Sequence, residues 1–362
     1  MALIKVKTGG VDNTTNLGRR NLIINGAMQV AQRGTSQTFT GVGNHFLVDR
    51  FFKGYGSSYA PDITMSQETD APAGFTNSLK MYVNSVTTPA SNHNMVFAQR
   101  IEGYNVTQLA YGTSDAKNVT LSFWVKSNQT GTRGVWMMAK GTSDREYMAS
   151  YTINTANTWE YKTVTIPPNT ITTPAGTTSE SILLTWPLST GSDDLVSAST
   201  SWVAENAYRG LSGEPDLCDT VGNYWQITGV QLEVGDTATP FEHRSFGEEL
   251  ALCQRYYEFF GNYDVTAQGT WLDVNNAYAA IQVPSSVPMR TLPTVIGTLE
   301  NRYGAGGSTW NDMAAGGGSV LPKGKSDGTG RVMNIVINSG TYTWSSKGWV
   351  RCSSTFAYDA EL

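Results

Sequence analysis

The sequence has few charged residues, few cysteines and no long apolar run. Charged residues make up 15% of the 362 positions, and the cysteines number three: Cys218, Cys253 and Cys352. An odd and widely spaced set argues against a disulfide framework and predicts reduced, mostly buried thiols. No stretch approaches the ~20 apolar residues that a membrane-spanning helix requires. The first ten residues lack the apolar core and cleavage site of a signal peptide, so we expect the chain to stay in a cytoplasm or to leave without secretion.

The charge balance argues against a protein that binds nucleic acid. The formal net charge is -5 and the isoelectric point is near 5.3, whereas nucleic-acid binding uses a basic face. The chain is instead rich in glycine (37), tyrosine (17) and tryptophan (10). Serine and threonine often stand beside valine, isoleucine or tyrosine. Such a composition favours strands and turns over helices, so we predict an all-β protein.

Residues 21–244 carry strand signals separated by turns. Asn21–Val30, with a bend at Asn25 and Gly26, is expected to be the first strand. In the segment 119–127, four apolar residues alternate with the outward positions Thr120, Ser122, Trp124 and Lys126, as in a half-buried strand. Eight or so antiparallel strands predict a jelly-roll β-sandwich of two stacked sheets. The clearest strand signals are Ser78–Val86, Met95–Gly103, Asn118–Ser127, Gly134–Gly141, Glu146–Asn154, Glu160–Pro167, Ser181–Leu188 and Tyr224–Val234.

The period of the apolar residues changes after residue 244. Ser245 is placed as a helix N-cap, and Glu248 completes a capping box three residues later. The spacing predicts a short α-helix over residues 245–260 with one apolar stripe. The stripe packs on its own domain or lines a symmetry axis between identical subunits, since heptad spacing suits both. Its members are Phe246, Leu250, Cys253, Tyr257 and Phe260.

Two further parts flank the predicted sandwich and helix. Residues 1–20 are polar and rich in glycine, asparagine and threonine, which indicates either a disordered terminus or an arm that orders against a partner. We favour the arm. Strand patterns resume over residues 261–362, interrupted by a loop dense in glycine and serine, and predict a smaller C-terminal β-sandwich domain. The expected domains are therefore 1–20, 21–244, the connecting helix 245–260, and 261–362.

The sequence contains no motif for catalysis or for a cofactor. His45, His93 and His243 are far apart and lack the spacing of a metal site or a catalytic triad. Asp193 and Asp194 suit a Ca²⁺ loop or, more simply, a solvated turn. No glycine-rich phosphate loop stands between a strand and a helix. The paired acids of a glycosidase are close in space rather than in sequence, so the sequence neither reveals nor requires them. We predict a protein that is not an enzyme and has no cofactor.

Aromatic residues in polar surroundings are the best candidates for ligand contacts. Their rings stack on sugars while neighbouring asparagine, aspartate and serine bond hydroxyl groups. The alternative is that these aromatics belong to a core or an interface, because tryptophan is largely buried on average. Trp124 and Trp136, on sandwich strands, are weaker candidates. The predicted glycan contacts are Tyr303, Trp310, Tyr342, Trp344 and Trp349.

Four stretches resemble a family of phage virion proteins. "NLIINGAMQVAQRGTS" (21–36) with "FLVDRF" (46–51) resembles the opening of bacteriophage tail-fibre and related virion proteins, many from marine and cyanobacterial phages. There it leads into a sandwich similar to carbohydrate-binding modules. "ITGVQLEVGDTATPFEHRSFGEELALCQRYY" (227–257) resembles the end of that module. "AIQVPSSVPMRTLPTV" (280–295) and "AYDAEL" (357–362) resemble the C-terminal β domain. The extended repeats and the shaft of a long fibre are missing.

The resemblance implies a non-enzymatic virion component on a phage tail. It is expected to be homotrimeric, to attach to other virion proteins by its N-terminal arm, and to bind host polysaccharide or lipopolysaccharide distally, with no nucleic acid and no membrane insertion. Gln29, Gln32 and Arg33 are the residues expected to seat the arm against the domain or a neighbouring subunit. The alternatives are a capsid decoration or tail-assembly protein without a ligand, and a polysaccharide depolymerase. The sequence identifies neither the receptor nor the position on the virion.

Overall fold

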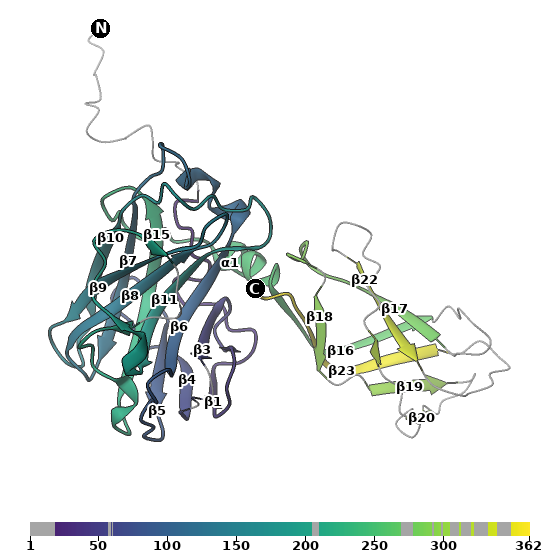
Figure 1. Ribbon diagram of the computed structural model, residues 1–362. Coiled ribbons are helices and arrows are strands. Elements are labelled where there is room, and N and C mark those ends of the chain that lie inside the picture. The colour runs from purple at the N-terminus through teal and green to yellow at the C-terminus, as the bar shows by residue number, and fades with distance from the viewer. Residues whose placement is uncertain are drawn as a thin grey trace, which may run out of the picture. The chain divides into compact units, whose positions relative to one another are not determined.

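The computed structural model describes residues 19–56, 59, 61–204, 210–268, 278–291, 293–297, 300–304, 311–312, 320–321, 332–338 and 349–362. The chain divides into two compact units, Met1–Phe246 and Gly247–Leu362 (Figure 1). The division falls at the start of the predicted helix segment. Within the described ranges, no helix is long and apolar enough to cross a membrane.

The first unit contains two large antiparallel sheets. One has six strands in the order β1-β4-β5-β15-β7-β10, and the other has seven in the order β13-β9-β8-β11-β6-β3-β2. Each of the eight segments that the sequence predicted as strands forms one, and the predicted all-β sandwich is confirmed. The strands of the first sheet are β1 (Ser36–Phe39), β4 (Ile63–Glu68), β5 (Ser78–Val83), β15 (Tyr224–Val234), β7 (Val119–Ser127) and β10 (Glu160–Ile166). Those of the second are β13 (Val203–Ala204), β9 (Arg145–Ile153), β8 (Gly131–Ala139), β11 (Glu180–Thr190), β6 (Asn94–Glu102), β3 (Phe51–Gly56) and β2 (His45–Phe46).

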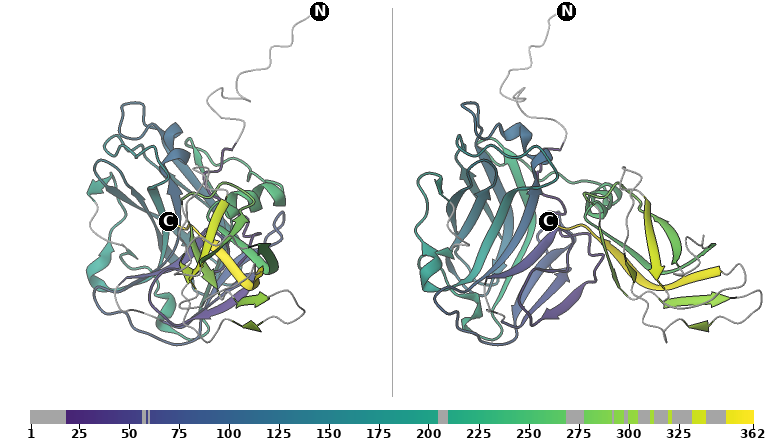
Figure 2. Two further views of the ribbon diagram at one scale, coloured as in Figure 1. Left: turned by 90° about the vertical axis from the view of Figure 1, so that its right-hand side faces the viewer. Right: turned by 45° about the vertical axis from the view of Figure 1, so that its right-hand side comes forward.

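The two sheets form two layers around one apolar core (Figure 2). Trp225 of the six-stranded sheet lies 6.2 Å from Trp186 of the seven-stranded sheet, measured between ring centroids. The inward positions of β7 are fully buried, as its alternation predicted. Two of the predicted outward positions, Thr120 and Ser122, are buried as well, and the Thr120 hydroxyl donates to the carbonyl of Gly235 (2.7 Å) in the segment that follows β15. Large aromatic side chains between the two sheets supply much of the buried apolar area that holds the sheets together.

The opening segment, residues 21–30, is largely buried but does not form the predicted first strand. Asn25 and Met28 have left-handed φ angles of 62° and 55°, whereas strand residues have strongly negative φ. A Cβ atom on Gly26 would lie 2.1 Å from the carbonyl oxygen of Val230. Only glycine therefore allows the close approach of this segment to β15. The first regular strand is β1.

Side-chain amides form the main-chain hydrogen bonds of the opening segment that a strand partner would otherwise form. Asn25 Oδ1 accepts from the N–H groups of Gln29 and Val30, both at 3.0 Å. Asn25 Nδ2 donates to the carbonyls of Val30 (2.8 Å) and Asp49 (3.0 Å). Gln99 on β6 both accepts from and donates to the main chain of Ile24. Buried main-chain N–H and carbonyl groups need hydrogen-bond partners. The strand prediction was wrong because amide side chains supply these partners here without a neighbouring strand.

The helix begins where the sequence predicted but ends early. It is α1, Phe246–Gln254, directly after Ser245. Tyr257 and Phe260 lie instead on β16 (Tyr257–Gln268), where Tyr257 pairs with Asp359. The aromatic run after residue 255 suits a strand, and this pairing overrides the helical spacing. The predicted stripe is therefore interrupted: Cys253 is buried, but Phe246 is 57% exposed.

The second unit carries a five-stranded and a three-stranded sheet. In the larger sheet β16 pairs with β23, which also pairs with β18 and β19, and β20 pairs with β19. The smaller sheet has the order β17-β22-β21. The remaining strands of this unit are β17 (Tyr278–Pro284), β18 (Thr294–Gly297), β19 (Glu300–Gly304), β20 (Asn311–Asp312), β21 (Val320–Leu321), β22 (Val332–Asn338) and β23 (Trp349–Asp359). In the first unit, the short parallel pair β12 (Leu195–Val196) and β14 (Gly210–Leu211) supplies Leu211 to a second apolar cluster with Trp136.

Candidate functional site

The five aromatic residues predicted as glycan contacts belong to the second unit. Trp310, Tyr342 and Trp344 lie outside the described residues. Tyr303 is on β19 and Trp349 is on the neighbouring strand β23. Tyr303 pairs with Val350, so the two aromatic residues are offset by one position. Their role in glycan binding stays a prediction. The first unit presents a different aromatic group, whose side chains are described.

Aromatic and charged side chains stand in three cross-strand rows on the outer face of the six-stranded sheet. The first row pairs Tyr82 of β5 with Tyr224 of β15. The second contains Lys80, Gln226 and Lys126, and the third pairs Trp124 of β7 with Tyr161 of β10. Rows lie roughly 7 Å apart along the strands, and neighbouring strands about 4.8 Å apart. We call this group the outer aromatic face, defined as Asp70, Lys80, Tyr82, Trp124, Lys126, Trp159, Tyr161, Tyr224 and Gln226.

The third row presents the most accessible ring. Tyr161 is 44% exposed, and its ring centroid lies 5.3 Å from that of Trp124 at an interplanar angle of 50°. Trp159, directly before β10, is half-buried, and its Nε1–H donates to Asp70 Oδ1 at 3.1 Å. An indole with a bonded N–H has a fixed orientation. This end of the face therefore offers preorganised apolar surface.

A carboxylate and an amide connect the rows. Lys126 Nζ lies 2.7 Å from Asp70 Oδ2, and Gln226 Nε2 donates to the Asp70 carbonyl (3.0 Å) and to Ser78 Oγ (2.7 Å). The hydrogen bond from Lys126 holds the pKa of Asp70 below its usual value, with a smaller contribution from Trp159. Asp70 is 51% exposed and ionised at neutral pH, so it can accept hydrogen bonds from a ligand.

The first row is organised around a cation. Lys80 Nζ lies 4.7 Å from the ring centroid of Tyr224 and 5.7 Å from that of Tyr82, distances typical of cation–π contacts. The Tyr224 hydroxyl donates to Asn157 Oδ1 at 2.7 Å, which fixes the ring under the ammonium group. Lys80 thus covers the faces of both tyrosine rings. The rings available to stack on a ligand are those of the third row.

The face is bounded by a loop that follows β4. Gly229, with φ 63°, lies in a bulge of β15, and a Cβ there would lie 2.6 Å from Phe75 and 3.1 Å from Trp124. Phe75 in turn packs on Phe241 at 5.0 Å and on His243 at 5.4 Å. The loop and the segment after β15 therefore cover the sheet on one side of Trp124.

Sequence reasoning treated this face as secondary. The alternation of β7 correctly placed Trp124 and Lys126 outward, and the same period in β5, β10 and β15 places Lys80, Tyr161 and Tyr224 on the same side. That signal was available in the sequence. The strand order β5-β15-β7, which brings these residues together, could not be inferred from the sequence.

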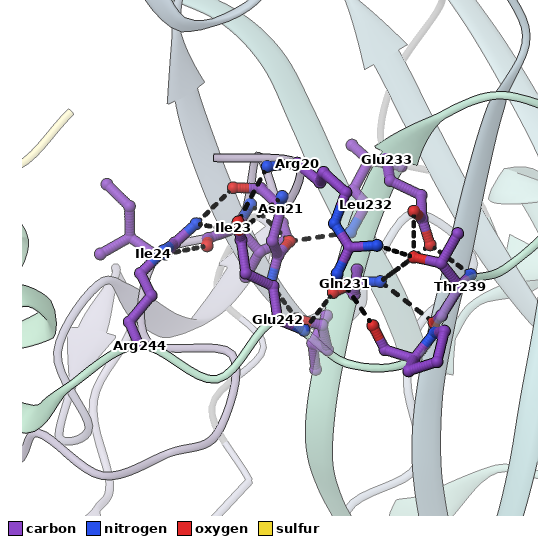
Figure 3. A network of polar contacts seen from close by, with 12 residues as sticks. Arg20, Asn21, Ile23, Ile24, Gln231, Leu232, Glu233, Thr239, Glu242 and Arg244 are labelled. Atoms are coloured by element: carbon purple, nitrogen blue, oxygen red, sulfur yellow. Dashed lines mark hydrogen bonds and ion pairs between the residues drawn. The ribbon is translucent and has the colours of Figure 1, made fainter. Parts of the chain in front are cut away.

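A polar network ties the opening segment to the segment after β15 (Figure 3). Glu242 accepts from the N–H groups of Arg20 (3.1 Å) and Asn21 (2.9 Å) and from Arg244 NH2 (3.1 Å). Arg244 also donates to the carbonyl of Asn21 at 2.6 Å. Glu242 N–H donates to Gln231 Oε1 at 2.8 Å. Burial tends to raise the pKa of Glu242, but the two amides and Arg244 hold it below its usual value.

The predicted arm residues contact their own domain. Gln32 donates from its main chain (3.1 Å) and its side chain to the carboxylate of Asp49, which is fully buried. Arg33 NH1 lies 3.7 Å from Asp49 Oδ1, and its guanidinium lies 4.9 Å from the Phe46 ring centroid. The carbonyl of Gln29 accepts from Gln67 Nε2 at 3.1 Å. Contact with an arm or a neighbouring subunit remains a prediction.

Arg33→Ala is expected to destabilise the first unit by about 1–2 kcal/mol. The change removes one partner of the buried Asp49 carboxylate, and losing a charged partner of a buried ion is costly. Urea unfolding measures the loss, and Arg33→Lys, which keeps the charge, should recover part of it. Polysaccharide affinity should not change. Lost affinity in a variant whose oligomeric state is intact would contradict this assignment.

Asp193, from the candidate Ca²⁺ loop, and the three histidines, which lack metal-site spacing, have ordinary structural contacts. Asp193 Oδ2 accepts from the Ser91 hydroxyl at 2.6 Å. His45 and His93 each bond a main-chain group within four residues, and His243 packs on Phe241 at 4.9 Å. Among the residues that the structure describes, no group of three or more histidine, cysteine, aspartate or glutamate side chains is arranged to hold a metal ion.

No protein-family model and no curated protein sequence matches this chain. Among solved structures, the enzymatically active domain of tailspike protein 4 from bacteriophage CBA120 aligns with a TM-score of 0.33 and 14% identity, over 60% of this chain and 22% of that one. The family 11 carbohydrate-binding module of a Clostridium thermocellum cellulase aligns with 0.27 and 11%, over 56% and 100%. The xylan-binding domain of Paenibacillus barcinonensis Xyn10C aligns with 0.26 and 8%, over 56% and 95%. At such TM-scores these likenesses transfer neither a site nor a function.

Proposed function

We propose that the first unit is a glycan-binding module that holds a sugar chain on its outer aromatic face. The observation that carries this proposal is the group of Trp124, Trp159 and Tyr161, whose rings stand beside the ionised Asp70–Lys126 pair. Ring faces contact the CH groups of a sugar, and a carboxylate and an ammonium bond its hydroxyls. Binding sites combine apolar surface with a few placed polar groups in this way.

We also propose that binding here is not coupled to cleavage of the sugar. A glycosidase needs a carboxylic acid that is protonated when it acts, beside a second carboxylate. Asp70 has the opposite character, because Lys126 lowers its pKa. Glu214, whose pKa burial raises to about 7, accepts from the N–H groups of Gly134, on β8 of the seven-stranded sheet, and of Leu211, on β14. It therefore does not belong to the face.

For the whole chain, we propose a phage virion adhesin, a homotrimer attached through residues 1–20. The motifs over 21–36 and 227–257 support this assignment by their resemblance to tail-fibre and related virion proteins. Binding at a single face is weak, and several copies on one particle would raise the effective affinity by about 10²–10⁴. The aromatic residues of the second unit, Trp349 among them, are a second candidate contact within the same adhesin.

Tyr161→Ala and Trp159→Ala are each expected to weaken binding of the full chain to its polysaccharide by about tenfold. A tenfold loss corresponds to ~1.4 kcal/mol, the scale of one well-placed aromatic contact. Affinity gel electrophoresis with purified bacterial envelope polysaccharides measures the change. The matched control is Tyr104→Ala, which removes a tyrosine that is 58% exposed on the turn after β6 and should leave binding unchanged.

Two outcomes of the same experiment would contradict the proposal. Unchanged binding in the Tyr161 and Trp159 variants, together with a loss in Trp349→Ala, would move the site to the second unit. Failure of the unmodified chain to bind any of the purified envelope polysaccharides would contradict glycan binding itself.

A further inference from the structure

We propose that the outer aromatic face selects an acidic glycan and that Lys80 binds a carboxylate of its sugar residues. This inference rests on the proposed glycan-binding function and adds the class of ligand. Lys80 is half-buried, with Nζ over the rings of Tyr224 and Tyr82. Among the described residues, no carboxylate forms an ion pair with it. The ammonium is thus placed over aromatic rings and is available to pair with a carboxylate of a ligand.

The neighbouring acids are engaged elsewhere. Ser66 stands opposite Lys80 in register, and its hydroxyl donates to Glu68 Oε1 at 2.6 Å. Asp70 pairs with Lys126. Lys80 and Lys126 are separated by β15, which puts their backbones about 10 Å apart, and Asp70 forms its ion pair with Lys126 rather than with Lys80.

Two parts of the outer aromatic face have different roles in this proposal. The third row and Asp70 contact sugar rings and hydroxyls, while Lys80 lies on the other side of Gln226, two strands away from Lys126. The whole chain carries a net charge of -5, so polyanions are not attracted to it in general. An acidic chain would be selected only by a local cation, and a charge-assisted hydrogen bond supplies that selection.

The test uses the full chain and a panel of acidic and neutral bacterial polysaccharides. Each acidic polysaccharide is also used after its carboxyl groups have been reduced to alcohols, which keeps the backbone and removes the charge. We expect an acidic polysaccharide to bind, carboxyl reduction to weaken it about tenfold, and Lys80→Met to weaken the acidic form by the same factor without affecting the reduced form. Lys80→Arg should retain binding. Lys117→Met, at an exposed lysine before β7, is the matched control.

The outcomes separate this inference from the proposed function. Equal binding of native and reduced polysaccharides, lost in Tyr161→Ala, would overturn the acidic class and keep the glycan site. A carboxylate preference that survives Lys80→Met would overturn the role of Lys80. The absence of binding to every member of the panel would overturn both proposals.

Discussion

Asn25→Ala is expected to lower the free energy of unfolding of the first unit by about 3–5 kcal/mol, near the upper end for single substitutions. The side chain is fully buried and bonds two N–H groups and two carbonyls of the main chain. Each buried group left without a partner costs roughly 1–3 kcal/mol. Alanine in the left-handed conformation adds about 1 kcal/mol. Urea unfolding followed by tryptophan fluorescence measures the loss.

Two further variants separate backbone strain from lost hydrogen bonds. Asn25→Gly removes the strain of the left-handed conformation and should recover only about 1 kcal/mol of the loss. Asn157→Ala is the matched control, because Asn157 has a similar φ of 58° but is exposed, and its amide accepts from the exposed Tyr224 hydroxyl rather than from buried main-chain groups. If Asn25→Ala costs no more than Asn157→Ala, the amide bonds do not stabilise the opening segment as described.

Glu242→Ala is expected to destabilise the first unit by about 2–3 kcal/mol at neutral pH. The carboxylate is bonded by the amides of Arg20 and Asn21 and by Arg244, and its side chain is only 17% exposed. Hydrogen bonds to charged groups contribute roughly 1.5–3 kcal/mol each, less where water competes. Urea unfolding at neutral pH, compared with the unmodified chain, measures the difference.

The same interaction should depend on pH in a defined direction. The folded state lowers the pKa of Glu242, so its contribution is complete above the ordinary glutamate pKa of about 4.3. It disappears as the pH falls through the lower, folded-state value. The gap between Glu242→Ala and the unmodified chain should therefore shrink in acid, and Glu242→Gln should fall between them at neutral pH. A gap that is constant with pH would show that the charge of Glu242 is not what stabilises the network.

The strands were predictable because their information is local. Alternation in the segment 119–127 gave both the buried face of β7 and the outward position of Trp124, and the capping residue Ser245 marked the start of α1. The end of α1 was not predictable, because Tyr257 pairs with Asp359 on β23, about 100 residues further along the chain.

The site was less predictable than the fold for the same reason. Lys80 and Tyr224 come together only because β5 and β15 are neighbours, and no local pattern encodes that order. The opening segment was misassigned as a strand because its apolar residues resemble one. The deciding features were the left-handed Asn25 and the partner Gln99 on β6, which only the folded chain reveals.

Hydroxyl-radical footprinting of the full chain with and without saturating polysaccharide tests the glycan site most directly. Mass spectrometry then reports the oxidation of each tyrosine and tryptophan. We expect bound polysaccharide to protect Trp159 and Tyr161 while Tyr104 remains as reactive as before. Protection confined to Tyr303, Trp349 and their neighbours in the second unit, with Trp159 and Tyr161 unchanged, would contradict the assignment of the site to the outer aromatic face.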